Sequence, residues 1–132
     1  MRKYIVPLQA SNPQLPIMFS DIGMNESVLA PYIPVSQTNE PYVFSDLNAN
    51  GVDDGREQQA NIYQALFNIN RGHDYLLRGT VFFGYAIDTD PSIALYNETH
   101  RVMEFHNKPA ERVIRDAYAE MGALPGGDST LP

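Results

Sequence analysis

Apolar residues follow two different patterns in this chain, and the pattern changes near residue 56. Before that point they come in short clusters, at residues 4–6, 15–19, 28–29, 32–35 and 42–44. Six of the ten prolines fall within the first 41 residues, between and within these clusters. Proline fixes φ, removes a hydrogen-bond donor and biases the preceding residue to extended geometry, so little room is left for a long helix. The pattern predicts an extended arm over residues 1–45, either irregular or with short edge strands.

A helical period begins at residue 56. Over residues 56–70 the spacing of i, i+3, i+4 and i+7 places four apolar residues on one stripe and two aromatic residues beside it. The stripe consists of Ile62, Ala65, Leu66 and Ile69, flanked by Tyr63 and Phe67. We expect this stripe to face the core. Gly72 follows as a stop signal.

Two further helices are predicted towards the C-terminus. Asp90 and Pro91 form a strong start, with Asp as the N-cap and Pro at the first helical position. The helix that they open extends to about residue 106, and its inward positions are Leu95, Thr99, Val102 and either Phe105 or His106. Asn107 and Pro109 mark the next boundary, and Gly122 ends the last helix. Its apolar face contains Val113, Ile114, Ala117, Tyr118 and Met121.

Between the first two helices, residues 76–87 allow two interpretations. Thr80, Val81 and Phe82 favour a buried strand, and Gly79 and Gly84 disfavour a helix. The short flanking turns also suit a helical hairpin, but we favour the strand. The predicted fold class is therefore α+β, mainly α. It is one domain with an arm (1–45), a loop (46–57), a body of about three helices with one possible strand (58–123), and a tail (124–132).

The loop at residues 46–57 is the part of the sequence that indicates a specific chemistry. It matches the pattern D-x-[DN]-x-[DN]-G-x5-E at every defined position. Asp46, Asn48 and Asn50 would supply side-chain oxygens, and Val52 its backbone carbonyl. Asp54 stands where a ligand often acts through water, and Glu57 where a carboxylate binds through both oxygens. Calcium is a hard cation that takes six to eight oxygen ligands, so this spacing predicts a calcium site.

This pattern is that of the EF-hand calcium loop. No second loop follows, and Asp53 stands at position 8, where paired EF-hands usually have an aliphatic residue. The segment therefore resembles the solitary calcium loops of dockerins and thrombospondin type 3 repeats. The resemblance covers twelve residues, and it implies a bound ion rather than a particular fold or activity. With two neutral Asn ligands, weak binding that suits a calcium-rich medium is expected.

A plain turn explains the same residues without an ion. An Asn- and Gly-rich turn would cap the following helix, since Asp is a good N-cap residue. Asp53, Asp54 and Gly55 fit this interpretation. The sequence leaves both possibilities open.

Composition narrows the classes of function. There are no cysteines among the 132 residues, which excludes disulfides, thiolate metal sites and Cys nucleophiles. The net charge of -7, with scattered basic residues, argues against nucleic acid and against anionic membranes as partners. We also expect no cleaved signal peptide and no transmembrane segment, because polar residues and prolines interrupt every apolar stretch.

Other groupings carry little chemistry. His100, Glu104 and His106 would need further ligands to hold a metal, and His73 with Asp74 lacks a serine in a nucleophile-elbow context. No catalytic residue is therefore predicted. Two glycosylation sequons, starting at Asn25 and Asn97, are attributed to chance.

These observations favour a non-enzymatic structural subunit of a large assembly over an enzyme. The expected partners are other protein subunits, contacted through the arm, although the arm could instead pack on its own body. Its small size, absent leader, arm and calcium loop are typical of virion proteins such as bacteriophage decoration, connector or minor tail subunits. The alternative is an extracellular, calcium-stabilised binding module for a peptide or a glycan. The expected location is accordingly virion or extracellular.

Overall fold

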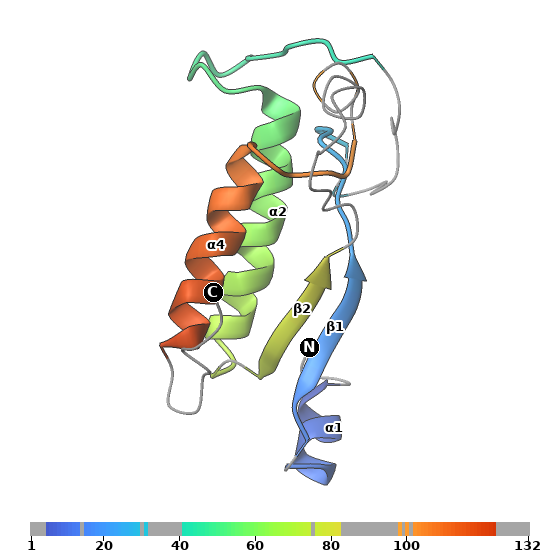
Figure 1. Ribbon diagram of the computed structural model, residues 1–132, viewed down its shortest axis with the longest axis vertical. Coiled ribbons are helices and arrows are strands. Elements are labelled where there is room, and N and C mark those ends of the chain that lie inside the picture. Colours follow the sequence, from blue (N-terminus) through green and yellow to red (C-terminus); the bar gives the residue numbers. More distant parts are fainter. Residues whose placement is uncertain are drawn as a thin grey trace.

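The computed structural model describes residues 5–13, 15–29, 31, 41–74, 76–82, 98, 100 and 102–123. These residues form α1 (Ile5–Ser11), β1 (Ile17–Ile22), α2 (Asp54–Arg71), β2 (Leu77–Phe82) and α4 (Pro109–Gly122), in that order. Figure 1 shows α2 and α4 side by side and running in the same direction, with the two strands beside them. The fold is mixed and mainly helical, as predicted. None of the helices described is both long and apolar enough to cross a bilayer.

The described part of the arm contains one strand and one short helix. Strand β1 confirms that extended structure forms between the prolines, whereas the seven-residue helix α1 was not predicted. Pro7 is the third residue of α1. It is tolerated there because the first N–H groups of a helix have no intrahelical acceptor.

The favoured strand at residues 76–87 is confirmed over Leu77–Phe82 as β2, which pairs in parallel with β1. Residues 83–87 of the predicted range lie outside the described residues. The register joins Ile17 to Leu77, Phe19 to Thr80 and Ile22 to Phe82, with two irregularities between them. A parallel pair needs a long crossover connection. Helix α2 lies within that connection, so the order β1–α2–β2 places the ends of both strands near the start of α2 (Figure 1).

The core lies between α2 and α4. Tyr63 packs edge-on against Phe105, with ring centroids 5.9 Å apart. The buried residues of the cluster are Ala60, Tyr63, Phe67, Phe105, Ala110, Ile114 and Ala117. The predicted stripe on α2 is therefore wrong as a core face. Ala65 and Ile69 are exposed, and the aromatic residues expected to flank the stripe are the buried ones. Tyr63 packs against Phe105, and Phe67 packs against Tyr118 of α4.

Helix α4 matches its prediction closely. Pro109 stands at its start and Gly122 at its end. Lys108 is extended, with φ -113° and ψ 162°, as the residue before a proline usually is. Ile114 and Ala117 are buried, and the Tyr118 hydroxyl donates to the carbonyl of Thr80 at 2.5 Å, which joins α4 to β2.

The predicted helix at residues 91–106 is wrong at its C-terminal end. Its first part, including Leu95 and Thr99, lies outside the described residues, but residues 102–106 are irregular, with a bend at Met103 and a turn beginning at His106. The Val102 carbonyl accepts the N–H of Glu26 at 3.3 Å, and the Val102 N–H donates to the Glu26 carboxylate at 3.2 Å. These backbone groups pair with a distant segment, so they are not available for a helix. Val102 and Phe105 are nevertheless buried, as expected.

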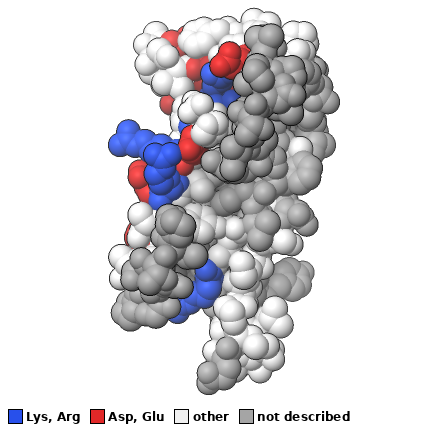
Figure 2. Space-filling model, viewed as in Figure 1, with Lys and Arg blue, Asp and Glu red and all other residues white. Residues whose placement is uncertain are grey.

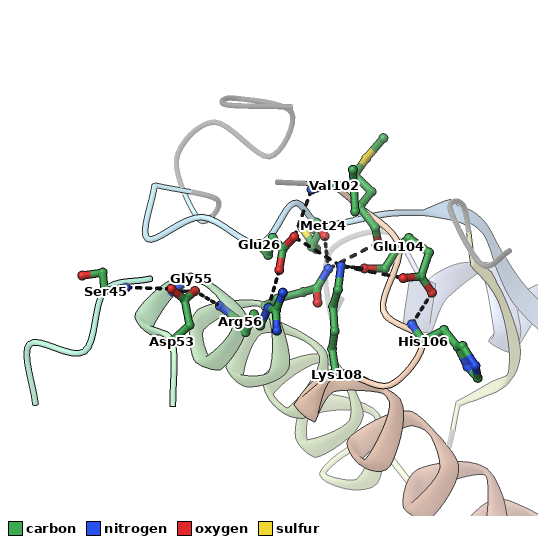
Figure 3. Close-up of polar contacts among 12 residues, drawn as sticks. Met24, Glu26, Ser45, Asp53, Gly55, Arg56, Val102, Glu104, His106 and Lys108 are labelled. Atoms are coloured by element: carbon green, nitrogen blue, oxygen red, sulfur yellow. Dashed lines mark hydrogen bonds and ion pairs between the residues drawn. The ribbon is translucent and has the colours of Figure 1, made fainter. Parts of the chain in front are cut away.

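A buried carboxylate joins three segments of the chain (Figure 3). The Glu26 side chain is 0% exposed, and one of its oxygens lies 2.9 Å from Nε of Arg56 in α2. Its other oxygen accepts from Nζ of Lys108, at the start of α4, and from the N–H of Val102, both at 3.2 Å. Residues 25–27 are all buried, so this part of the arm packs on its own body.

Neighbouring polar groups complete this cluster. Lys108 also donates to the carbonyl of Glu104 at 2.7 Å. Burial lowers the pKa of the Lys108 ammonium, and the carboxylates of Glu26 and Glu104 oppose that shift. Gln59, itself fully buried, donates to the carbonyl of Met24 at 2.7 Å. The charges are thus paired, which is the condition under which buried charges are tolerated.

We predict that Glu26→Gln destabilises the protein by about 3–5 kcal/mol. The substitution preserves the shape of the side chain, but it removes the negative charge that pairs with the buried Lys108 and with Arg56. Breaking a buried ion pair by removing one partner typically costs about 3–5 kcal/mol of stability. Urea unfolding followed by circular dichroism measures the loss.

The matched control for this prediction is Glu120→Gln. Glu120 pairs with Arg71, but both side chains are about 40% exposed, so the expected loss is at most about 1 kcal/mol. Equal losses for the two variants would show that the buried cluster contributes no more than a surface pair.

Candidate calcium-binding loop

The predicted loop connects the arm to α2. Leu47 and Asn48 form a turn, and residues 50–52 form a bend. Helix α2 begins at Asp54, which is position 9 of the loop. No helix is present in residues 41–53, so the loop has an exiting helix but no entering helix on its immediate N-terminal side. This arrangement differs from a helix–loop–helix unit.

The first part of the loop curls around the carboxylate of Asp46. That carboxylate accepts the backbone N–H of Asn50 at 3.0 Å and of Gly51 at 2.8 Å. Gly51 has a φ of +81°, in the left-handed region that glycine adopts without steric cost. Position 6 of the pattern therefore requires glycine for a physical reason, the sharp turn that returns the chain towards Asp46.

Three of the predicted ligands meet on one side of the loop. The side-chain amides of Asn48 and Asn50 donate to the two carboxylate oxygens of Glu57, at 2.8 Å and 3.0 Å. Loop positions 3, 5 and 12 are thus brought together across the first turn of α2. Rotating either amide by half a turn would present its oxygen instead of its nitrogen, which is the atom that a cation needs.

The remaining predicted ligands are engaged differently. Asp54 accepts the Ser45 hydroxyl at 2.6 Å and the N–H of Leu47 at 3.1 Å, so it secures the start of the loop. Val52 donates its N–H to the side-chain oxygen of Asn50 at 2.8 Å. To act on an ion through water, Asp54 would have to exchange one of these contacts.

Donor chemistry and charge fit a hard cation, although the geometry is that of hydrogen bonds. Three carboxylates and two amides supply only oxygen ligands of the kind that calcium prefers. Within the described part of the chain, no group of three or more His, Cys, Asp or Glu side chains is placed to hold a metal ion. Three of the five side chains are the carboxylates of Asp46, Asp54 and Glu57, so the loop in this conformation does not bring these three together around a common point.

Asp53 caps α2, as the plain-turn interpretation requires. Its carboxylate accepts the N–H groups of Gly55 at 3.0 Å and Arg56 at 3.1 Å, and that of Ser45 at 2.9 Å. It is 2% exposed. Because Asp53 is not one of the predicted ligands, capping and ion binding do not compete for the same oxygens.

The other candidates from the sequence gain no support. His73 and Asp74 line a pocket of about 390 Å³ together with Gln9 and Arg78, and none of its described lining residues is a serine. His106 lies 3.5 Å from the Glu111 carboxylate, an ordinary side-chain pair. Asn25, the first residue of one sequon, is completely buried, so an enzyme could not reach it in the folded chain.

Comparison with models of protein families, with curated proteins and with solved structures gave no match for this chain.

No pattern in the sequence indicates which residues connect this loop to the body. Arg56 lies between the loop and the core, with its guanidinium carbon 4.4 Å from the centre of the Tyr42 ring and its Nε on Glu26. These partners are separated from Arg56 by 14 and 30 positions. The one local signal is the position of Arg56 in the first turn of a helix, where a positive charge is unfavourable because of the helix dipole. An arginine there indicates that a nearby negative charge offsets this cost.

We predict that Asp53→Ala destabilises the protein by about 1 kcal/mol, the usual cost of a lost N-cap. The loss should be the same in calcium and in chelator, because Asp53 is not a proposed ligand. Urea unfolding in the two buffers measures it. Asp53→Ser retains a capping oxygen and should lose less. A loss confined to calcium buffer would instead assign Asp53 to the ion.

Proposed function

We propose that this protein is a non-enzymatic structural subunit of a large assembly, of the virion type represented by bacteriophage decoration, connector and minor tail subunits. The arm contacts neighbouring subunits, and one calcium ion stabilises the loop at residues 46–57. The observation that carries the proposal is the concentration of exposed apolar side chains in the arm and at the start of the loop.

Among the described residues of the first 47 positions, nine large apolar ones are exposed: Val6, Leu8, Leu15, Met18, Val28, Leu29, Val43, Phe44 and Leu47. Leu47 is 90% exposed and Val43 69%. Single exposed apolar residues are ordinary, but groups of them mark interaction surfaces. Figure 2 supports this reading, since the charged side chains gather over the helices and the loop, and the surface towards α1 is largely uncharged.

The proposed ion would act at the junction between arm and body. Arg56 is position 11 of the loop and lies in the first turn of α2, where it contacts Tyr42 and Glu26, both from the arm. Glu57, the next residue, receives both Asn amides of the loop. An ion bound by these groups would hold the loop against α2 and so fix the direction in which residues 41–45 leave the body. Its role would be structural rather than catalytic.

We predict that calcium stabilises the protein through Glu57. Because the ion would bind only the folded loop, stability should rise by about 2.7 kcal/mol at a hundredfold excess over Kd. Unfolding of wild type and Glu57→Gln in calcium and in chelator measures the shift, which the substitution should largely remove. Asp116→Asn is the matched control, because it removes a carboxylate that is 70% exposed on α4.

The result that contradicts the calcium part of the proposal is identical unfolding of wild type in calcium and in chelator. The loop would then be a capping turn alone. Magnesium provides a second comparison, since it requires a nearly octahedral site and gives up its water reluctantly. We expect it to stabilise the protein less than calcium at the same concentration.

We predict that the exposed arm exchanges its amide hydrogens rapidly in the isolated protein. Residues 42–46 have no regular secondary structure, whereas the amides of α2 are bonded within the helix and partly buried. The Ser45 amide is the exception, because it donates to the carboxylate of Asp53 and should exchange more slowly. Local opening free energies are near zero in such segments and approach the global value in core helices. Hydrogen exchange with mass spectrometry measures the contrast, and peptides spanning residues 25–27, which are buried, provide the internal control.

Protection of residues 42–46 equal to that of α2 would count against an arm that awaits a neighbour. A folded monomer with a protected arm is the expected behaviour of the alternative, a self-contained extracellular binding module for a peptide or a glycan.

A further inference from the structure

The apolar stripe on α2 (Ile62, Ala65, Leu66 and Ile69) is not used by the core. Ile69 is 50% exposed, Ala65 is exposed, and the other two are half-buried. The stripe forms one wall of an open groove of about 440 Å³, and Phe19, Ile22 and Met24 form the other. Such a surface on a described helix needs an occupant, because apolar area exposed to water is unfavourable.

The charge of α2 restricts what that occupant can be. Residues 58–70 contain no Asp, Glu, Lys or Arg, although the whole chain carries a net charge of -7. Two copies of so acidic a protein repel one another over most of their surfaces. A face without charges is where they can approach at the least electrostatic cost.

The order of the residues in the stripe identifies the occupant. Read in either direction, the stripe has an isoleucine at each end and an Ala–Leu pair at the centre. In a two-fold symmetric interface each residue meets a counterpart and the relation is reciprocal. If two α2 helices cross antiparallel with the axis between positions 65 and 66, Ile62 faces Ile69 of the second copy. Ala65 then faces Leu66 of the second copy, a small residue opposite a large one.

We propose that α2 is a self-association surface, on which a second copy of this chain packs antiparallel through the stripe. Small residues at the centre of a helix pair allow the two backbones to approach, and alternating sizes let the side chains interdigitate. The groove wall from β1 then covers the flank of the second helix. This contact uses α2 and the part of the arm around β1, but not the loop and not residues 42–46. It therefore does not depend on the proposed calcium ion or on the contacts proposed for residues 42–46.

Sedimentation equilibrium over a range of protein concentrations tests the proposal. Wild type should form a dimer, and Ile69→Glu should raise the dimer dissociation constant about tenfold or more, because two buried isoleucines become charged. Gln64→Glu is the matched control: it adds the same charge on the side of α2 away from the stripe, and the dimer should persist. Ala65→Glu, at an exposed position, repeats the test if circular dichroism shows that Ile69→Glu has lost helix.

The double variant Ile62→Lys with Ile69→Glu tests the antiparallel register. In that register each lysine faces a glutamate of the second copy, so dimerisation should recover relative to Ile69→Glu alone. In a parallel pair like charges would face each other, and the variant would stay monomeric, which would overturn the register. A monomeric wild type, or a dimer unaffected by Ile69→Glu and Ala65→Glu, would overturn the proposal itself and leave the stripe for a different partner.

Discussion

The carboxylate of Glu26 is the interaction on which the arrangement of the described elements depends. It lies just after β1, and it meets the first turn of α2 through Arg56 and the first residue before α4 through Lys108. Both helices begin at this end of the molecule (Figure 1), so two positive helix ends favour a negative charge there. Without this carboxylate, the buried Lys108 ammonium would have Glu104 as its only described counter-charge. This buried polar cluster therefore helps to position β1 relative to the helices, together with Ile22, which packs against the apolar core between α2 and α4.

The sequence predicts those features whose cause lies within a few residues. Asp53 and Pro109 mark helix starts, Gly122 a helix end, and the β-branched and aromatic residues near position 80 a strand, and the structure confirms each one. The buried cluster could not be predicted in this way. The partners of Glu26 lie 30, 76 and 82 positions away along the chain. The same distant contacts explain why residues 102–106 are not helical, since both the N–H and the carbonyl of Val102 are hydrogen-bonded to Glu26.

On α2, the face predicted to be buried is partly exposed and the flanking aromatic face is buried, and this difference does not come from distant hydrogen bonds. The helix carries two apolar surfaces, an aliphatic one at Ile62, Leu66 and Ile69 and an aromatic one at Tyr63 and Phe67. Periodicity alone cannot decide which of them is buried, because both have helical spacing. Packing decides it: Tyr63 meets Phe105, and Phe67 meets Tyr118 with ring centroids 6.4 Å apart. The aliphatic surface that local pattern predicts as core is thereby left for another use.

Position 8 of the loop explains how one segment can serve both as a cap and as a candidate ion site. In paired EF-hands an aliphatic residue there joins two loops, whereas Asp53 turns its carboxylate back onto the first turn of α2 and is buried by it. Asp53 therefore attaches the loop to a single helix, α2. Asp46, Asn48, Asn50 and Glu57 remain on the other side of that attachment, where hydrogen bonds among them hold the turn that an ion would otherwise organise. Because the cap already positions Glu57 relative to the loop, little of the ion's binding energy would be needed to order the chain. Binding energy would be available to stabilise the junction between arm and body, which is the role that a structural site requires.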